Sequence, residues 1–416
     1  MPGEEHRSTS IFDTNLRITA IGFFLLILLS TTITAAPAAG AQTFSVLHDF
    51  TNGLDGGEPQ AGLSMDRAGN FYGTASTGGN TSGACSNRNP HGCGTVFKLS
   101  RRGSDWVFTT LYTFSGPDGA NPLARVIVGP DGSLYGTTSA GGSADQGTVF
   151  NLRPPLVPCK TTSCPWKETV LYNFHGSDGG QPTFGDLVFD AAGNIYGTTP
   201  RAGNGMVYKL TRSTGGWTET ILYTFHGGND GAIPYAGLTF DHFGNLWGAT
   251  AFGGIYNDGT IYELVPSGGG WAENVVYVFH GGNDGANPYG GLIVDQSGNF
   301  YGTTFGANGS PVEVYELSPS SGGWTFNTLY TFSHNQGIIG KLAMDAAGNL
   351  YGTNYYDVPE VFRLTPSNGG WTLTGSWGGV GDNPCGNVTF DGSGNLYTTT
   401  QGGGSGEVGL VFEITP

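Results

Sequence analysis

The chain has 416 residues, 74 of them glycine, and only 12% of its residues are charged. Glycine in this excess suits many short strands joined by tight turns, because it adopts the positive φ that such turns need. Glycine does not recur at every third position, which excludes collagen. The formal net charge of −16 repels nucleic acid and anionic lipid, so we exclude both as partners.

The N-terminal segment has the layout of a secretory signal peptide. Arg17 precedes an apolar run over Ile18–Leu29, and a stretch of small residues ends at Ala39-Gly40-Ala41. We expect residues 1–41 to be cleaved and residues 42–416 to form one secreted domain, extracellular or periplasmic, with no membrane insertion after cleavage. An uncleaved anchor is the alternative, although the apolar run is short for a bilayer span.

One signature recurs along the rest of the chain and reads Asp-x-x-Gly-Asn-Leu-Tyr-Gly-Thr. Its seven copies begin at Asp66, Gly129, Asp190, Asp241, Asp295, Asp345 and Asp391. Each copy lies among three other segments that alternate apolar and polar residues: a short apolar stretch before it, a Thr-Val-Phe-x-Leu strand after it, and a Leu-Tyr-x-Phe strand. Four strands in each of seven repeats predict an all-β, seven-bladed β-propeller.

The two ends of the chain predict how the ring closes. A spare outer strand, Val46–Phe50, precedes the first complete repeat, and the last repeat ends after its third strand, Leu410–Ile414. We expect the N-terminal strand to pair with the last blade and complete its four strands. This closure removes the exposed sheet edges that would otherwise promote aggregation.

These repeats resemble the GloVer-repeat proteins, also called choice-of-anchor tandem repeat GloVer-containing proteins. The resemblance rests on GNLYGTT, on the GTVFxL strand, and on LYxF followed by DGAxP, as in Phe114–Pro122. It implies an exported protein of largely unknown activity that often carries a C-terminal sorting anchor. It carries over no catalytic residue, and this chain ends at Pro416 without such a tail.

The five cysteines suit local disulfides in an oxidising compartment. We expect Cys85 to pair with Cys93 and Cys159 with Cys164. The spacing does not suit a tetrahedral zinc site. Cys385 is left over, and we expect a small buried core residue there, with a reactive thiol as the alternative.

Two sets of polar residues recur by repeat symmetry, which favours structural roles. Histidine follows the Leu-Tyr-x-Phe strand at His175, His226 and His280, and Asp-Gly turns recur at Asp55, Asp118, Asp178, Asp230 and Asp284. The alternative for the aspartates is a ring of carboxylates that holds calcium, but each loop supplies one carboxylate and calcium needs six or more oxygen ligands. We therefore expect no cofactor and no metal.

Residues that break the symmetry are better candidates for a site. The position just before each innermost strand carries Gly62, Arg125, Asp186, Gly237, Gly291, Lys341 and Asn387. We expect Arg125, Asp186, Lys341 and Asn387 to converge at one end of the axial channel, with the glycines leaving room for a ligand. The alternative is a channel-lining salt bridge between Arg125 and Asp186.

Aromatic residues lie two positions earlier, at Tyr235 and Tyr289, beside the glycine side of this ring. They offer stacking platforms for a sugar ring or another flat ligand. Wedging between neighbouring blades is the alternative for both.

No G-x-S-x-G, H-E-x-x-H, phosphate-binding loop or EF-hand occurs. The leading hypothesis is a monomeric, non-enzymatic scaffold propeller that binds a glycan, peptide or envelope component. The first rival is a propeller lyase or hydrolase with Asp186 as base and Arg125 or Lys341 stabilising an anion. The second rival is a purely structural surface protein.

Overall fold

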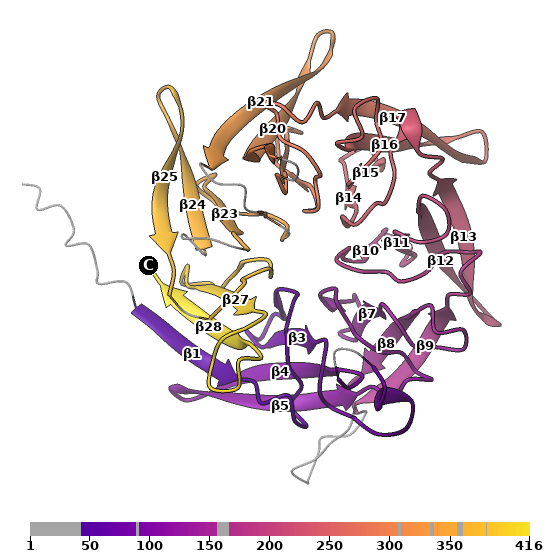
Figure 1. Ribbon diagram of the computed structural model, residues 1–416, viewed down its shortest axis with the longest axis vertical. Coiled ribbons are helices and arrows are strands. Elements are labelled where there is room, and N and C mark those ends of the chain that lie inside the picture. Colours follow the sequence, from indigo (N-terminus) through magenta and orange to yellow (C-terminus); the bar gives the residue numbers. More distant parts are fainter. Residues whose placement is uncertain are drawn as a thin grey trace, which may run out of the picture. The chain divides into compact units, whose positions relative to one another are not determined.

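The computed structural model describes residues 43–88, 91–155, 166–306, 309–332, 337–338, 340–355, 361–379 and 381–416. The predicted signal peptide, Cys159 and Cys164 lie outside these residues. The unit formed by Gln42–Pro416 contains seven antiparallel four-stranded sheets arranged in a ring (Figure 1). The predicted seven-bladed β-propeller is therefore confirmed.

The seven blades repeat one strand order from the central channel outward. The innermost strands are β2 (Ser64–Met65), β6 (Ile127–Val128), β10 (Val188–Phe189), β14 (Thr239–Phe240), β18 (Ile293–Val294), β22 (Ala343–Met344) and β26 (Thr389–Phe390). The second strands are β3 (Phe71–Ala75), β7 (Leu134–Thr138), β11 (Ile195–Thr199), β15 (Leu246–Thr250), β19 (Phe300–Thr303), β23 (Leu350–Thr353) and β27 (Leu396–Thr400).

The outer half of each blade consists of longer strands. The third strands are β4 (Thr95–Arg102), β8 (Thr148–Arg153), β12 (Met206–Ser213), β16 (Thr260–Ser267), β20 (Val312–Ser320), β24 (Val361–Ser367) and β28 (Leu410–Thr415). The outermost strands are β5 (Asp105–Thr113), β9 (Lys167–Asn173), β13 (Gly216–Thr224), β17 (Gly270–Val278), β21 (Gly323–Phe332), β25 (Gly370–Trp377) and β1 (Thr43–Asp49). Loops of the described part of the chain contain the short 3-10 helices η1 (Gly83–Cys85) and η2 (Gly228–Asp230). Blades are numbered 1 to 7 from β2 onward.

The aspartate that begins the signature organises the first hairpin turn, between the innermost and second strands, in six of the seven blades; blade 2 has Gly129 at this position. In blade 1, Asp66 Oδ1 accepts the backbone N–H groups of Ala68 and Asn70, and Oδ2 accepts Asn70 Nδ2 at 2.8 Å and the Tyr72 hydroxyl at 2.9 Å. Gly69 has φ +78°, as the turn requires. The same four donors bind Asp190, Asp295, Asp345 and Asp391, and at Asp241 the Trp247 indole replaces the tyrosine.

Adjacent blades are joined by aromatic packing and by hydrogen bonds from the signature threonines. Phe50, Leu63, Phe71 and Tyr397 belong to one buried cluster that spans blades 7 and 1, and further clusters join the other neighbours. The threonine hydroxyls donate to carbonyl groups in the loop of a neighbouring blade, as in Thr74 to Ala124, Thr198 to Ala236 and Thr399 to Ala61. These contacts fix the rotation of each blade against the next.

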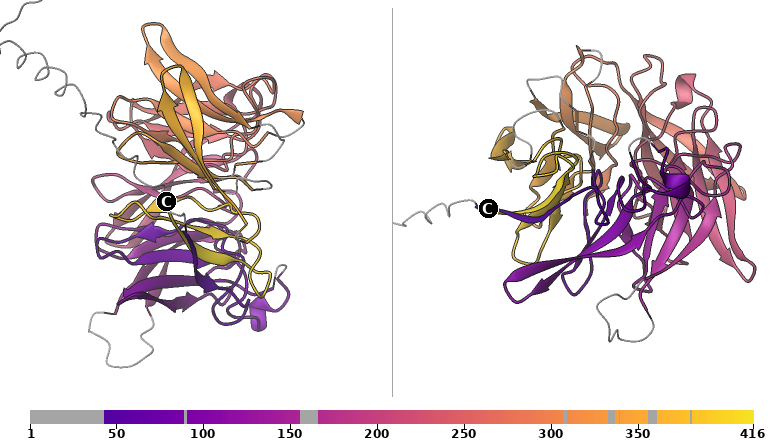
Figure 2. Two further views of the ribbon diagram at one scale, coloured as in Figure 1. Left: turned by 90° about the vertical axis from the view of Figure 1, so that its left-hand side faces the viewer. Right: turned by 60° about the horizontal axis from the view of Figure 1, so that its bottom comes forward.

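The N-terminal strand closes the ring as expected. Strand β1 pairs antiparallel with β28, with Phe44 opposite Ile414 and a bulge between Val46 and His48. Figure 2 shows the indigo β1 beside the yellow β28, so blade 7 combines both ends of the described chain. The outer edge of β28 is thereby paired, and no other strand in the described residues covers it.

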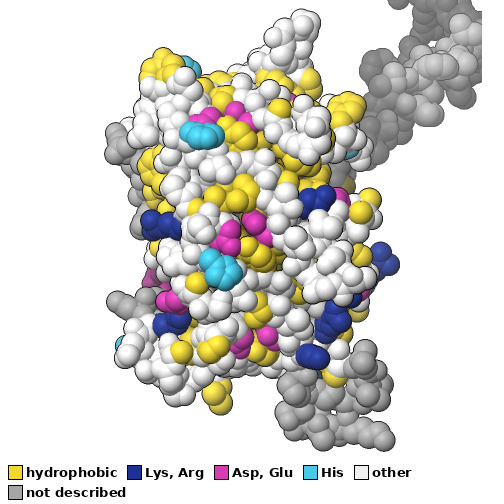
Figure 3. Space-filling view, turned by 90° about the vertical axis from the view of Figure 1, so that its right-hand side faces the viewer, with side chains coloured by type: hydrophobic (Ala, Val, Ile, Leu, Met, Phe, Trp, Pro, Cys, Tyr) yellow, Lys and Arg dark blue, Asp and Glu magenta, His cyan; other side chains and the backbone are white. Residues whose placement is uncertain are grey.

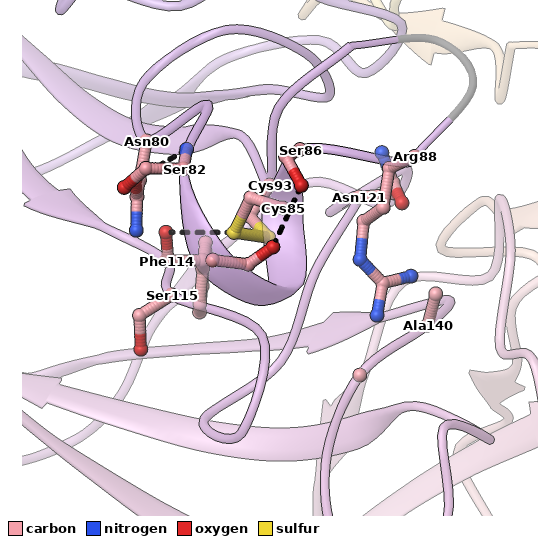
Figure 4. The surroundings of a disulfide bond; sticks show 12 residues. Asn80, Ser82, Cys85, Ser86, Arg88, Cys93, Phe114, Ser115, Asn121 and Ala140 are labelled. Carbon is pink, nitrogen blue, oxygen red and sulfur yellow. Dashed lines mark hydrogen bonds between the residues drawn. A yellow bond between two sulfur atoms is a disulfide. The ribbon is translucent and has the colours of Figure 1, made fainter.

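One of the two predicted disulfides lies in the described residues and is formed. Cys85, the last residue of η1, bonds to Cys93 across a Cα–Cα distance of 5.3 Å (Figure 4). Both sulfur atoms are buried in the cluster between blades 1 and 2, with Phe114. Cys385 is free and buried. Burial raises the pKa of its thiol to about 12, which favours the expected role as a buried core residue over that of a reactive thiol.

A row of carboxyl groups between the blades was not expected from the sequence. Glu168, Glu219 and Glu273 occupy one position of β9, β13 and β17, opposite a leucine of the third strand. Blades 1, 5 and 6 have Phe108, Phe326 and Leu373 there. Each of the three glutamates has one buried carboxyl oxygen without a hydrogen-bond partner among the described residues.

The three glutamates have raised pKa values for a common reason. Burial, and to a smaller extent the negative charge of Asp118, raise the pKa of Glu168 to about 8. Burial with the charges of Asp178 and Asp230 raises the pKa values of Glu219 and Glu273 to about 7. The folded protein therefore binds protons here that the unfolded chain releases near pH 4.5.

We predict that stability falls as the pH rises through 7 to 8. A raised carboxyl pKa contributes stability that is complete below the unfolded pKa and lost above the folded one. Glu219→Gln should raise the free energy of unfolding at pH 9 by roughly 1 kcal/mol, because half-exposed groups are partly screened. Urea unfolding at pH 5, 7 and 9 measures this effect. Asp105→Asn removes an exposed carboxylate and serves as the charge-matched control; an equal gain in both variants contradicts the explanation.

We also predict that the ring depends on β1. Deleting residues 43–49 exposes the backbone edge of β28, which should cause aggregation and a lower unfolding temperature. Size-exclusion chromatography and thermal unfolding measure both effects. The control is a chain that begins at residue 42, and a monomeric deletion variant that unfolds at the control's temperature would show that β1 is dispensable.

Candidate functional site

Four polar side chains meet at the end of the channel where the innermost strands begin, here called the mouth. They come from blades 2, 3, 6 and 7, because each stands just before the first strand of its blade. One cavity is lined by all four, together with residues of the preceding loops: Arg125, Asp186, Lys341, Asn387, Gln60, Leu123, Phe184 and Cys385. The structure thus brings together the four polar residues that the broken repeat symmetry singled out.

The Asp186 carboxylate is the centre of this group. Its Oδ2 atom accepts two bonds from Arg125, from Nη2 at 2.7 Å and from Nε at 3.1 Å. Asn387 Nδ2 donates to the same oxygen from blade 7, at 3.3 Å. Asp186 is buried, with 8% of its surface exposed, so the ion pair forms largely out of contact with water.

Lys341 completes the group from blade 6. Its ammonium group donates to Thr239 Oγ1 at 2.8 Å, across the channel in blade 4, and its backbone N–H donates to Asn387 Oδ1 at 2.6 Å. Enclosure by the channel wall lowers the pKa of the Lys341 ammonium group to about 8, a change that the charge of Asp186 opposes and that of Arg125 reinforces. The amine is therefore partly neutral in mildly basic solution.

The glycines of the mouth do not leave the open space that the sequence suggested. A Cβ atom on Gly62 would lie 2.3 Å from the Asn387 carbonyl oxygen, and one on Gly237 would lie 2.7 Å from the Asp186 backbone nitrogen. A Cβ on Gly291 would lie 3.3 Å from Lys341 Cδ. Glycine is thus needed for close approach between neighbouring blades and for the stem of Lys341.

The cavity that remains at the mouth is small. Its volume, about 20 Å³ of space for the centre of a water molecule, suffices for roughly one water. A sugar ring or a peptide side chain does not fit without displacing the polar group. Arg125, Asp186 and Asn387, which bond to one another, and Lys341, which bonds to Thr239, therefore act together as a plug in this structure.

The two candidate tyrosines belong to a row of four aromatic rings beside the plug. The ring centroids of Tyr235 and Tyr289 are 5.2 Å apart. Phe184 lies 6.3 Å from Tyr235, and Phe305 lies 4.8 Å from Tyr289. All four rings are half-buried, so they both pack between blades 3 to 5 and present part of their surface to solvent.

The repeated histidines and turn aspartates form local pairs on the loops. His175, His226 and His280 contact Asp178, Asp230 and Asp284 at 3.2, 3.1 and 2.9 Å. A tyrosine of the outermost strand also donates to each of these aspartates. On the side of the molecule in Figure 3, histidines lie beside acidic side chains. Within the described ranges, no three His, Cys, Asp or Glu side chains are grouped to hold a metal ion.

Sequence reasoning missed two larger cavities at the other end of the channel, between the first hairpin turns. One has a volume of about 790 Å³ and is lined by turn residues of blades 1 and 2 and by Phe189. The other has a volume of about 500 Å³, lies between blades 3 and 4 and includes Phe189, Phe240 and Trp271.

No helix in the described part of the chain has the length and apolar character needed to cross a membrane.

Comparisons with solved structures show the propeller fold alone. A putative oxidoreductase (glucose dehydrogenase) of Thermus thermophilus shares 15% identity and a TM-score of 0.47, covering 90% of this chain and 100% of that one. The PQQ-bound aldose sugar dehydrogenase of Streptomyces coelicolor shares 11% identity and a TM-score of 0.45, covering 90% and 98%. PorZ, a surface component of the type-IX secretion system of Porphyromonas gingivalis, shares 12% identity and a TM-score of 0.52, covering 84% and 46%.

None of the proteins of curated function matches this chain. The Gloeobacter/Verrucomicrobia repeat, in contrast, matches residues 31–199, 78–312 and 157–360. These overlapping matches span most of the chain and coincide with the blades described above. The chain therefore belongs to the Gloeobacter/Verrucomicrobia repeat family, in agreement with the resemblance noted from its GNLYGTT segments.

Proposed function

We propose that the protein is an exported, non-catalytic propeller that acts as a scaffold and binds a glycan or peptide of the cell envelope through its loop face. The loop face is the side of the ring that carries the mouth. The observation that carries this proposal is the plug itself, because its charged groups are already bonded, Arg125 to Asp186 and Lys341 to Thr239, and leave space for about one water. A substrate pocket for hydrolysis or elimination normally has several hundred cubic ångströms and a base free to act.

The Cys85–Cys93 disulfide supports export, because stable disulfides form mainly outside the cytoplasm. The N-terminal leader points in the same direction. The acidic composition makes an uncharged or cationic ligand more favourable than an anionic one.

The aromatic row is the part of the loop face best suited to bind a ligand. Tyr235 and Tyr289 are half-buried, and neither hydroxyl has a hydrogen-bond partner among the described residues. Such rings give a ligand both an apolar face and a polar atom, the combination used by sugar-binding surfaces. The plug beside them fixes the loops that carry them.

The lyase or hydrolase remains the second candidate, for one reason. Lys341, with a pKa of about 8, lies in the same small cavity as Asp186 and Arg125, so a base and an anion-stabilising cation are near each other. The amine would have to leave Thr239, and the plug would have to open, before a substrate could reach either group.

We predict that the ion pair between Arg125 and Asp186 contributes to the stability of the folded protein. Asp186→Ala leaves the Arg125 guanidinium without its counter-charge and should cost about 2 kcal/mol. The double variant Arg125→Met with Asp186→Leu should recover most of that loss, because apolar side chains of similar size tolerate the same site. Urea unfolding measures both values. Arg101→Ala, which removes a mostly exposed cation 3.8 Å from Glu413, is the control and should change stability by less than about 0.5 kcal/mol.

The function itself is tested by binding and by turnover. The purified protein should bind one or more insoluble polysaccharide or peptidoglycan fractions in a pull-down assay. Tyr235→Ala combined with Tyr289→Ala should weaken that binding about 10-fold, since each ring contributes roughly 0.5–1.5 kcal/mol. Tyr256→Ala removes an exposed tyrosine of another loop and is the matched control.

Two outcomes would contradict this function. Turnover in a lyase and hydrolase panel that disappears in Asp186→Ala supports the enzyme. No binding together with no turnover supports a purely structural protein.

A further inference from the structure

The groove between blades 3 and 4 has the size of a ligand site and lies at the end of the channel opposite the mouth. Its volume is about 500 Å³, within the range of roughly 300–1,000 Å³ that is typical of small-molecule pockets. Its lining includes Phe189, Tyr196, Phe240 and Trp271, together with the first hairpin turns of both blades. The face of the propeller opposite the mouth therefore has a concave surface of its own, separate from the plug.

The floor of the groove is aromatic and partly exposed. Phe189, Phe240 and Trp271 are half-buried. Tyr196 packs edge-on against Phe240 at 5.2 Å and against Trp271 at 6.4 Å between ring centroids. The indole N–H of Trp271 is neither buried nor bonded to another described residue. The rings are thus held by the fold and line the groove, and the indole N–H of Trp271 is free to donate to a ligand.

The charges of the groove favour a neutral ligand. No lysine or arginine lines it, although Lys209 lies over the Tyr196 ring at 5.4 Å. Asp190 and Asp241 do line it, but each carboxylate already accepts four hydrogen bonds, three from its own turn and one from the second strand of its blade. Burial raises the pKa of Asp190, and the bonds from Asn194 outweigh that effect and hold the pKa below its usual value, so this carboxylate is a poor general acid or base.

The hairpin turn at the rim of the groove differs from the other six. Its central residues are His242 and Phe243, and no other signature turn carries an aromatic residue there. The Phe243 side chain is 91% exposed and stands beside the groove, whose lining contains its neighbours His242 and Gly244. His242 Nε2 lies 3.3 Å from the Asp295 carbonyl oxygen of the neighbouring turn, which steadies the turn that displays Phe243.

The groove continues toward blades 1 and 2. Phe189 lines both this groove and the cavity of about 790 Å³ beside it. A chain molecule can therefore occupy successive grooves on this face, whereas a single small ligand would fill one of them.

We propose that the groove between blades 3 and 4 binds an uncharged polysaccharide, whose sugar rings stack on Trp271, Phe240 and Phe243. The face of a pyranose ring is apolar and its hydroxyls remain free to bond the indole N–H and water, which matches this combination of groups. The proposal rests on the protein being a binding propeller, as proposed above, but it uses another face and other residues.

The test is titration of the purified protein with cellohexaose, maltohexaose and chitohexaose, followed by calorimetry and tryptophan fluorescence. At least one of these neutral hexasaccharides should bind, and polygalacturonate should not compete. Phe243→Ala should weaken binding about 5-fold without loss of stability, because this side chain is exposed. Trp271→Ala should weaken it at least 10-fold.

Matched controls come from the next blade. Trp324→Ala removes the equivalent tryptophan of blade 5, and Gln296→Ala changes the equivalent turn; both should leave binding unchanged. The inference is overturned if none of the three hexasaccharides binds at millimolar concentration, or if Phe243→Ala and Trp271→Ala bind as the unsubstituted protein does. Loss of sugar binding in the Tyr235→Ala, Tyr289→Ala variant alone would reject the groove and retain the proposed function. Binding of an apolar peptide or detergent that Phe243→Ala abolishes, with no sugar binding, would show a hydrophobic docking surface instead.

Discussion

The hydrogen-bonded aspartate of the first hairpin turn is the interaction on which the propeller depends. In six blades Asp66 and its equivalents accept two backbone N–H groups, one asparagine side chain and one aromatic donor, which is a tyrosine hydroxyl except at Asp241, where it is the Trp247 indole. Because the tyrosine comes from the second strand, the turn also fixes the orientation of a ring that packs on the neighbouring blade. Tyr72 and Trp166, with ring centroids 5.9 Å apart, illustrate this link between a turn and a blade interface. An aspartate that stabilises a local turn therefore also influences how neighbouring blades of the propeller pack against each other.

Most contacts between neighbouring blades are apolar, so a glutamate at such an interface makes the packing there sensitive to pH. Where Phe326 stacks on Tyr277 with centroids 4.1 Å apart, blades 4 and 5 share an apolar contact. The equivalent place in blades 2, 3 and 4 holds a glutamate beside an aspartate of the preceding loop. Burial of the carboxyl group favours its neutral form, so packing at these three interfaces is most favourable when the glutamate is protonated. Glu313 of blade 5 behaves in the same way, because burial raises its pKa to about 7.

The ring and its closure could be predicted from the sequence because they depend on repetition and on the direction of the chain. The position of Arg125, Asp186, Lys341 and Asn387 at the mouth followed from the same register. What these four side chains do there could not be predicted, since it depends on distances across the channel, such as that from Lys341 to Thr239 in blade 4. The role of the mouth glycines Gly62, Gly237 and Gly291 was also predicted wrongly. The space left by a missing side chain can be filled by a ligand or by a neighbouring residue, and the sequence does not distinguish the two.

A sealed mouth changes where a propeller of this kind can bind. If the polar plug occupies the axis, recognition moves to the two faces, where each blade presents a similar set of groups at a fixed spacing. The tryptophans of the outermost strands recur in this way, and Trp217, Trp271, Trp324 and Trp371 all pack against the neighbouring blade while remaining half-exposed. Repeated weak contacts on one rigid ring suit a polymer, because each contact after the first is intramolecular and gains from a high effective concentration. In the polysaccharide binding proposed above, the irregular residues, Phe243 foremost among them, would decide where along the ring the strongest contact forms.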